Sequence, residues 1–375
     1  MNQVRIMHLA DFHLGLTFPF LEGLNEKRQS QMLQSFHQVC QLANEQKIDI
    51  LLIAGDFLEA ATISQAFLES IKQGLASIQA KVFLIAGNHD YYSFGSSYSQ
   101  ADWPANVHIF TENTISPIDL DDLNTSVYGA SFTQTYVRES SLEGFRVQDP
   151  SRINLVLLHG DLYSKDGLYN SISKEAINQS QAEYIALGHI HKPCDINYEG
   201  KTAYAYAGSP FGQSFAETGK RSVIIGDISK EGMNFQRKYL KGPSFEVVRF
   251  DLSGLTTNHA LAKAIKEKID QSFDKAQENY YRIILEGYRQ ADFYVDTASL
   301  RSYFDAYQYL EILDQSRTGL DLDALEKEVS LEGFFVKGMI EKIDKAHASQ
   351  NYDLQNQLTQ ALEMGLAILE QVKGG

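Results

Sequence analysis

Residues 82–90 are Val-Phe-Leu-Ile-Ala-Gly-Asn-His-Asp, an apolar run that ends abruptly in the polar residues Asn88, His89 and Asp90. A short apolar run without alternation is typical of a β-strand that is buried on both faces. The polar residues would then lie at the carboxyl end of that strand, where open α/β sheets bind their ligands. The stretch therefore predicts a buried strand with a functional group of side chains at its tip.

Four further apolar runs end in the same way. Their tips are Asp11-Phe-His13 after residues 4–10, Gly55-Asp56 after residues 48–54, His159-Gly160-Asp161 after residues 153–158, and Gly188-His189-Ile190-His191 after residues 184–187. Amphipathic helix patterns at residues 33–43 and 67–78 separate the first three runs. Strands that alternate with helices predict an α/β layer architecture. We expect all five tips on one side of one sheet.

The residue types at these tips suit a metal site. Carboxylate, carboxamide and imidazole groups together fit manganese, iron or zinc better than magnesium or calcium, which prefer shells made of oxygen alone. There are more ligands than one ion needs, so we predict two divalent transition-metal ions, with manganese as the first choice and iron or zinc as alternatives. A single Gly-Asp or a lone histidine would be an ordinary turn, so this prediction depends on the five tips together.

This ordered set of motifs resembles the calcineurin-like metallophosphoesterase family over residues 4–230: Asp-x-His, Gly-Asp, Gly-Asn-His-Asp, His and Gly-His-x-His. The resemblance implies a four-layered αββα sandwich that holds two metal ions. The ligands of one ion would be Asp11, His13 and His191, and those of the other Asn88, His159 and His189, with Asp56 bridging the two. His89 would face the substrate as a catalytic residue, with Asp90 orienting its ring.

Two further segments narrow the resemblance. Protein phosphatases of this family follow Gly-Asp with a pattern that ends in Asp-Arg and have Gly-Asn-His-Glu, whereas this chain has no such arginine and has Asp90. Residues 206–220 contain Gly-Ser-Pro and Phe-x-Glu-x-Gly, and they resemble the corresponding segment of SbcD-type DNA repair exonucleases, in particular a YhaO-like branch. One position departs from that pattern. Glu59 stands where these nucleases commonly have a second histidine, which contributes to their handling of DNA ends.

The sequence pattern changes after Lys241-Gly-Pro-Ser244, which indicates a turn or linker. Residues 245–250 and 281–286 have strand patterns and residues 261–273 a helix pattern, which together predict a small βαβ-type unit. Leucines then recur at helical spacing from residue 354 to residue 369. We predict a catalytic domain at residues 1–243, an α+β capping domain at 244–320 and a helical C-terminal segment at 321–375. The apolar cluster of residues 334–340 is a candidate docking patch for a partner.

Composition excludes several classes of protein. The chain has 375 residues, 43% of them hydrophobic and 22% charged, which is typical of a globular protein and not of a disordered or collagen-like one. Its longest apolar runs are far shorter than the roughly 20 residues of a transmembrane helix, so no membrane span is expected. Cys40 and Cys194 indicate no disulfide framework, and the N-terminus has no signal-peptide pattern. We therefore expect a cytoplasmic protein.

The predicted function is a metal-dependent phosphodiesterase or nuclease that acts on DNA together with an SbcC-like ATPase, and a homodimer is left open. Tyr91, Tyr92 and Ser209 are the predicted substrate-binding residues; aromatic rings beside the metals would stack on bases, unless they pack within their own loop. The net charge of 33 − 48 = −15 is unfavourable for gripping DNA alone. It favours the first alternative, an enzyme for a nucleotide or other small phosphodiester. The second alternative is a non-enzymatic regulatory subunit of an ATPase.

Overall fold

A computed structural model describes residues 3–21, 23–59, 63–162, 164, 167–290, 293–318, 322–349 and 351–373. The chain divides into two compact units. Unit 1 consists of Met1–Val247, Gln277–Arg282 and Tyr307–Tyr309, and unit 2 of Val248–Ala276, Ile283–Ala306 and Leu310–Gly375. The three-domain division stays a prediction, and its boundary between residues 320 and 321 lies outside the described residues.

Unit 1 contains a six-stranded sheet in the order β12-β11-β1-β2-β3-β4. Its strands are β1 (Gln3–Leu9), β2 (Ile50–Ala54), β3 (Lys81–Ile85), β4 (Val107–Ile109), β11 (Ser222–Ser229) and β12 (Met233–Tyr239). The first four run parallel to one another, and β11 and β12 add an antiparallel edge. Parallel neighbours bring the carboxyl ends of β1, β2 and β3 to the same edge of the sheet.

A second six-stranded sheet of unit 1 has the order β5-β6-β7-β8-β10-β9. Its strands are β5 (Ser116–Leu120), β6 (Thr125–Gly129), β7 (Ile153–His159), β8 (Tyr184–Gly188), β9 (Asn197–Glu199) and β10 (Thr202–Tyr206). The inner strands β6, β7, β8 and β10 are parallel, and β5 and β9 are antiparallel to their neighbours. Here too, β7 and β8 end at a common edge.

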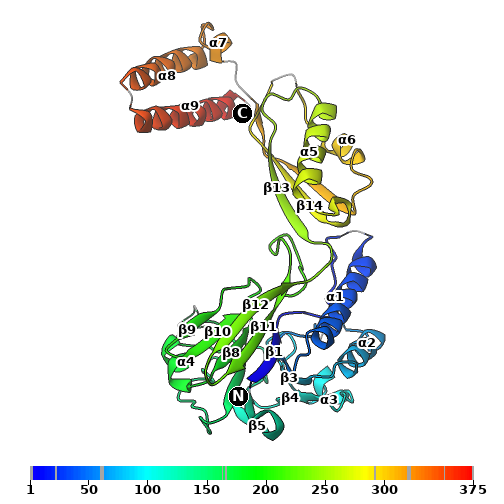
Figure 1. Cartoon of the computed structure of the whole chain (residues 1–375). Coiled ribbons are helices and arrows are strands. Elements are labelled where there is room, and N and C mark those ends of the chain that lie inside the picture. The colour runs from blue at the N-terminus through cyan, green and yellow to red at the C-terminus, as the bar shows by residue number, and fades with distance from the viewer. Residues whose placement is uncertain are drawn as a thin grey trace. The chain divides into compact units, whose positions relative to one another are not determined.

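The two sheets pack face to face with helices outside them, which confirms the four-layered sandwich (Figure 1). Leu52 of the first sheet and Leu155 of the second belong to the buried layer between the sheets. On the outer face of the first sheet, Leu51 packs in one core with Phe36 from α1 (Asn25–Glu45) and with α2 (Gln65–Ala76). The second sheet is covered by α4 (Lys174–Ser180), and a short α3 spans Ser97–Gln100.

The expectation that the five functional strands share one sheet was wrong. The tips of β1, β2 and β3 belong to the first sheet, and those of β7 and β8 belong to the second. The pattern of apolar runs identifies buried strands correctly, but both sheets of a sandwich are buried on both faces, so the runs alone do not distinguish them. The tips nevertheless meet, because the carboxyl ends of both sets of strands lie at the same side of the sandwich.

Unit 2 contains strands and helices in the predicted strand–helix–strand order. A three-stranded sheet has the order β13-β14-β16, and each of its strands has one to three of its first residues in unit 1. Helix α5 lies in the connection from β13 to β14, and α6 lies in the connection from β14 to β16. The bounds are β13 (Phe245–Asp251), α5 (Asn258–Ser272), β14 (Tyr280–Glu286), β15 (Tyr288–Arg289), α6 (Thr297–Ser302), β16 (Tyr309–Asp314) and β17 (Arg317–Thr318). Thr257 caps α5, since its hydroxyl accepts a hydrogen bond from Ala260 N.

The C-terminal segment is helical, as predicted, with α7 (Leu322–Leu325), α8 (Leu331–Ala348) and α9 (Tyr352–Lys373). The candidate docking patch is corrected by the structure. Val336 and Met339 are buried where α8 packs on α9, and Phe335 and Ile340 pack against the same small core. Phe334 alone of this cluster is well exposed, at 69%. Within the described ranges, none of the helices has the length and apolarity needed to cross a membrane.

His8 on β1 predicts a loss of stability in acid. The ring is fully buried, with Nδ1 2.8 Å from Tyr184 Oη, and burial, followed by the positive charge of Arg237, lowers the pKa of His8 to about 3. The unfolded chain binds a proton below about pH 6.5, whereas the native chain does not until about pH 3. The free energy of unfolding should therefore fall by roughly 1.4 kcal/mol per pH unit across that window because of this residue.

Urea unfolding between pH 7 and pH 4.5 measures this contribution. His8→Gln, which keeps a hydrogen-bonding group for Tyr184, should show a shallower loss of stability with falling pH than the wild type. His37→Gln removes a histidine from the exposed face of α1 and is the control. Parallel pH dependences for the wild type and His8→Gln would contradict the prediction.

Candidate metal centre

Hydrogen bonds to the backbone join neighbouring strand tips at one edge of unit 1, and His89 N donates to Asp56 Oδ1 at 2.9 Å, which joins the tips of β3 and β2. Asp11 N donates to Gly55 O at 3.0 Å, which joins the tips of β1 and β2. Gly160 N donates to Gly188 O at 3.2 Å, which joins the tips of β7 and β8. The two sheets approach closely here, because a Cβ on Gly188 would lie 1.9 Å from Ala54 O. Glycine at residue 188 is therefore needed for the tips of the two sheets to meet.

The first cluster of possible ligands consists of Asp11, His13 and His191. One ligand atom from each lies within 4.8 Å of the others, and His13 Nε2 is 3.2 Å from His191 Nε2. Two ring nitrogens at that distance can point at one cation. Asp11 Oδ1 accepts a hydrogen bond from His189 N, whereas Asp11 Oδ2 is buried and has no hydrogen-bond partner among the described residues. An orphaned buried carboxylate oxygen beside two imidazoles fits a metal ion.

The second cluster consists of Asp56, Asn88, His159 and His189. Asn88 Oδ1 lies 3.0 Å from His159 Nε2 and 3.2 Å from His189 Nδ1. Asp56 Oδ2 lies 3.4 Å from His159 Nε2. The outer nitrogen of His159, Nδ1, is 3.0 Å from the carbonyl of Ala54. That contact leaves Nε2 to face the other ligands, which is the orientation that a metal-binding histidine needs.

Asp56 lies between the two clusters. The same oxygen, Oδ2, is 3.7 Å from His13 Nε2 in the first cluster and 3.4 Å from His159 Nε2 in the second. Burial opposes ionisation of this carboxyl group, but the rings of His159 and His13 hold the pKa of Asp56 well below its usual range. An ionised carboxylate in this place can share one oxygen between two cations.

The histidines differ in their electrostatic surroundings. Burial, followed by the charge of His159, lowers the pKa of His189 to about 4, so its ring is neutral at pH 7 and ready to bind a cation. Although burial opposes it, the Asp56 carboxylate raises the pKa of His159 to about 9. A histidine must be neutral to bind a metal ion, so a cation here would displace a proton from the second cluster.

Four of the strand-tip residues have a left-handed backbone. The φ angle is 54° at Asp11, 52° at His13, 47° at Asp56 and 101° at His189. This conformation favours glycine and costs about 1–3 kcal/mol for other residues. Such strain persists only where the surrounding structure imposes it, and it is concentrated at functional sites. The ligand positions are therefore held by the fold and not by local preference.

The sequence pattern of calcineurin-like phosphoesterases matches residues 4–193, which include every residue of both clusters. The chain belongs to the calcineurin-like phosphoesterase family. This phosphoesterase is 26% identical over 265 residues to the SbcD component of the nuclease SbcCD of Bacillus subtilis, covering 60% of this chain and 66% of the relative. It is also 26% identical over 227 residues to the "DNA double-strand break repair protein Mre11" of Aeropyrum pernix, covering 54% and 53%.

The chain thus spans about half to two thirds of the length of these curated relatives. Among solved structures, a dimetal phosphatase from Danio rerio superposes with a TM-score of 0.43 at 11% identity, over 63% of this chain and 96% of that one. Members of the phosphoesterase family bind divalent metal ions. The clusters described above are candidate sites for such ions.

Two glutamates lie behind the histidines of the first cluster of the phosphoesterase. Glu59 Oε2 is 3.1 Å from His13 Nδ1, and Glu217 Oε1 is 2.7 Å from His191 Nδ1. A carboxylate behind a ligand histidine fixes its tautomer and the orientation of its ring. Neither contact was predicted. Glu217 is the glutamate of the Phe-x-Glu-x-Gly segment, and Glu59 stands where the nuclease pattern has a histidine. Neither motif predicts which histidine the glutamate contacts.

His89 and Asp90 have different surroundings. The His89 side chain is 49% exposed at the edge of the clusters, and its Nδ1 lies 3.4 Å from Glu59 Oε2. The Asp90 carboxylate is buried and accepts hydrogen bonds from the main-chain nitrogens of residues 57, 58 and 87 and from Tyr98 Oη. Asp90 therefore braces the loop of His89, and Glu59 is better placed to orient the His89 ring.

The three predicted substrate-binding residues differ in how exposed their side chains are. Tyr91 is 38% exposed, whereas Tyr92 is partly buried and packs against the core of unit 1. Ser209 is buried, and its hydroxyl donates to Phe211 O at 2.5 Å, while its backbone N donates to His191 O. Ser209 therefore supports the loop of His191. Tyr91 is the predicted contact whose side chain is available to a substrate.

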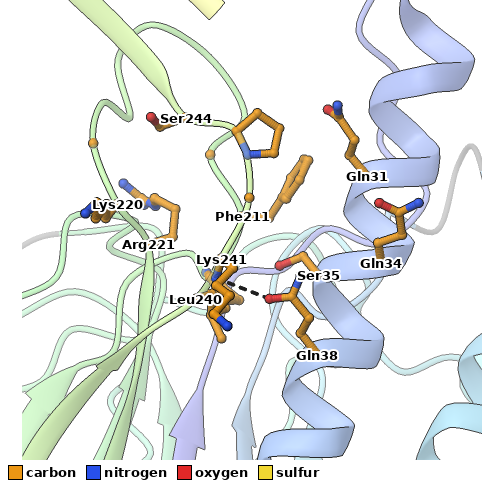
Figure 2. A pocket seen from close by; sticks show the side chains of 15 residues that line it. Gln31, Gln34, Ser35, Gln38, Phe211, Lys220, Arg221, Leu240, Lys241 and Ser244 are labelled. Carbon is orange, nitrogen blue, oxygen red and sulfur yellow. Dashed lines mark hydrogen bonds between the residues drawn. The ribbon is translucent and has the colours of Figure 1, made fainter. Parts of the chain in front are cut away.

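A small pocket of about 50 Å³ lies apart from the clusters, beside α1 (Figure 2). Its lining comes from residues 31–38, 210–212, 219–221 and 240–244, and Gln38 Oε1 accepts a hydrogen bond from Lys241 N at 3.2 Å. Arg221 lines this pocket and also donates to Ser209 O and His191 O, at 2.8 and 3.0 Å. The pocket thus adjoins the loop behind His191 without containing the strand tips.

Proposed function

We propose that this phosphoesterase hydrolyses phosphodiester bonds in DNA with two divalent transition-metal ions bound at the strand tips. The observation that carries the proposal is the convergence of seven ligand-type side chains, from five strands of two sheets, beside the exposed ring of His89. The charges are arranged for an anionic substrate, because two cations held there would lie beside the half-exposed ring of His89. Manganese is the proposed metal, since the ligands mix oxygen and nitrogen donors.

The clusters divide the ligands between the two ions. We assign Asp11, His13 and His191 to one ion, and Asn88, His159 and His189 to the other, with Asp56 shared. The division follows the short distances within each cluster and the position of Asp56 Oδ2 between His13 and His159. The buried Asp11 Oδ2, which has no hydrogen-bond partner among the described residues, would coordinate the cation instead.

The chemistry of the chain's own residues follows from this arrangement. Divalent ions, when bound, neutralise the phosphodiester and make a water molecule acidic enough to attack phosphorus. The fold fixes the strand tips, and they would hold the diester next to that water. The entropic cost of bringing the diester and the water together in the reaction is therefore lowered. His89, with Nδ1–H turned to Glu59, can give a proton from Nε2 to the leaving oxygen when its ring is doubly protonated. Tyr91, two residues further along the chain and exposed, is the proposed contact for a base or sugar of the substrate.

The choice of DNA is supported by the relatives, which are named as part of a nuclease and as a DNA double-strand break repair protein. The net charge of −15 limits what the chain can do alone, because phosphate neutralisation supplies most non-specific affinity for DNA. We therefore propose an SbcC-like ATPase as partner, which would add basic surface and deliver DNA to the strand tips.

One assay tests the proposed function. The purified chain is given single-stranded DNA, double-stranded DNA, a nucleotide diester and a chromogenic phosphodiester, each with Mn²⁺ and with EDTA, with and without an SbcC-like ATPase from the same organism. We expect slow, Mn²⁺-dependent cleavage of DNA by the chain alone. Binding of duplex DNA should weaken roughly 10- to 40-fold between 50 and 200 mM salt if two or three phosphates are contacted. The ATPase should raise both binding and cleavage.

Each alternative has its own outcome in this assay. Rapid hydrolysis of the nucleotide diester, with no action on DNA in either state, would assign the site to a small phosphodiester. Absence of hydrolysis of every substrate, together with a change in ATPase activity, would assign a regulatory role. Nanomolar binding of duplex DNA by the lone chain at 150 mM salt would contradict the argument from charge.

A further inference from the structure

Glu59 contacts both a ligand of the first cluster and the exposed histidine. Its Oε2 lies 3.1 Å from His13 Nδ1 and 3.4 Å from His89 Nδ1. The rings of His13 and His89 meet edge to face, with centroids 4.7 Å apart. The Glu59 side chain is only 16% exposed. One largely buried carboxylate oxygen therefore joins two histidines for which different tasks are proposed.

We infer that Glu59 is a positioning residue that couples the ligand His13 to the proton donor His89. The inference rests on the proposed function and adds a residue to it. An ionised carboxylate only accepts hydrogen bonds, so each ring must present Nδ1–H to it. That requirement leaves Nε2 as the nitrogen that faces away from Glu59 in both rings. In His13 this nitrogen is unprotonated and faces His191 Nε2, 3.2 Å away, whereas in His89 it carries, in the doubly protonated ring, the proton for the leaving oxygen.

A histidine at residue 59 could not orient the rings of both His13 and His89. A neutral imidazole offers one acceptor nitrogen, so it could orient one of the two rings but not both. A carboxylate is also anionic, so it strengthens the donors that face it. The replacement that distinguishes this chain from the nuclease pattern therefore changes the chemistry of the site, and it makes the orientation of His89 depend on the same group as the orientation of His13.

The segment of Glu59 is held from both sides. Glu59 N donates to Leu14 O at 2.9 Å, and Leu14 N donates to Phe57 O at 2.9 Å, which ties the segment to the one that carries His13. The Asp90 carboxylate accepts hydrogen bonds from the main-chain nitrogens of residues 57 and 58, which ties it to the loop that carries His89. The carboxylate is thus fixed relative to both rings.

Glu217 offers a matched comparison. It contacts the outer nitrogen of His191, the other histidine of the first cluster, in the way that Glu59 contacts His13. Its further partners are Arg221 and the backbone nitrogen of Gln213, and they belong to the supporting loop. Glu59 and Glu217 therefore share the role of supporting a proposed metal ligand. They differ in that Glu59 also contacts His89.

The experiment compares Glu59→Gln with Glu217→Gln. Calorimetric titration with Mn²⁺ measures metal affinity without any substrate. Turnover and KM at saturating Mn²⁺ are then measured on bis-nitrophenyl phosphate and on a thymidine dinucleotide. Nitrophenolate leaves without a proton, whereas the deoxyribose oxygen of the dinucleotide needs one. A residue that positions a proton donor should therefore matter more for the dinucleotide, and circular dichroism checks that each variant is folded.

Both variants should lose about 10- to 100-fold in affinity for the first ion, the usual effect of removing a carboxylate behind a ligand histidine. At saturating Mn²⁺, Glu59→Gln should lower turnover on the dinucleotide at least about 10-fold more than on bis-nitrophenyl phosphate, with KM little changed. Glu217→Gln should lower turnover on both substrates by the same factor. Equal losses on the two substrates in Glu59→Gln, or unchanged metal affinity in it, would overturn the coupling.

Failure of the inference is distinct from failure of the proposed function. If the wild type hydrolyses none of the diesters with Mn²⁺, the proposed function fails, and the calorimetric titration still decides whether Glu59 supports the ligand His13. If the wild type is active and His89→Ala is impaired while Glu59→Gln is not, the proposed function stands and the role of Glu59 is refuted.

Discussion

His89→Ala should lower turnover about 10²- to 10⁴-fold while the metal content of the protein stays near that of the wild type. The size is the usual contribution of a general acid or base. The ring is half exposed and its Nδ1 faces Glu59, so truncation removes the proposed proton donor and none of the seven proposed ligands. The measurement is the steady-state rate on DNA and on a chromogenic diester, together with elemental analysis of the same preparation.

His37→Ala, on the exposed face of α1, controls for the loss of a histidine and should keep the wild-type rate. If His89→Ala instead loses its metal ions, His89 is a ligand and the proposed assignment of roles is wrong. A rate within a factor of about three of the wild type, with metals retained, would remove His89 from the reaction.

Asp56→Asn should weaken the binding of both metal ions at least about 100-fold, more than the effect of a residue behind the ligands. The Oδ2 atom faces His13 and His159 at once, and an amide in its place carries no charge to offset two cations. Asp56 Oδ1 also accepts a hydrogen bond from His89 N, so the loop of His89 should loosen as well. Calorimetric titration with Mn²⁺ and elemental analysis give the affinity and number of ions.

His191→Ala is the matched variant, because it removes a ligand of the first cluster alone. It should weaken one ion and leave the other close to its wild-type affinity. A wild type that retains no more than one ion after soaking in Mn²⁺ would count against the two-ion site. Loss of only one ion in Asp56→Asn would show that this carboxylate is not shared.

The strands and their tips could be predicted because burial leaves a local record in the sequence. A strand covered on both faces is a short apolar run, and the first polar residue after it marks the edge of the sheet, as at Asp11, Asp56 and Asn88. That local record does not say which sheet a strand joins, since pairing is decided by contacts between distant residues. The assignment of β7 and β8 to a second sheet therefore had to come from the structure.

The residues behind the ligands could not be predicted for the same reason. Glu59 and His13 are 46 residues apart, and Glu217 and His191 are 26 apart, so no periodicity connects them. Asp90 was expected to serve its neighbour His89, but adjacent residues in an irregular loop often point in different directions. Ser209, expected at the substrate, donates its hydroxyl within its own turn.

The left-handed backbone at Asp11, His13, Asp56 and His189 sets two objectives of protein engineering against each other. Glycine adopts that conformation without strain, so a glycine at any of these positions would relieve about 1–3 kcal/mol of backbone energy and remove a proposed ligand at the same time. Directed evolution for heat tolerance or expression yield alone would therefore tend to accept inactive variants here. A library of this phosphoesterase needs a screen for metal retention in every round.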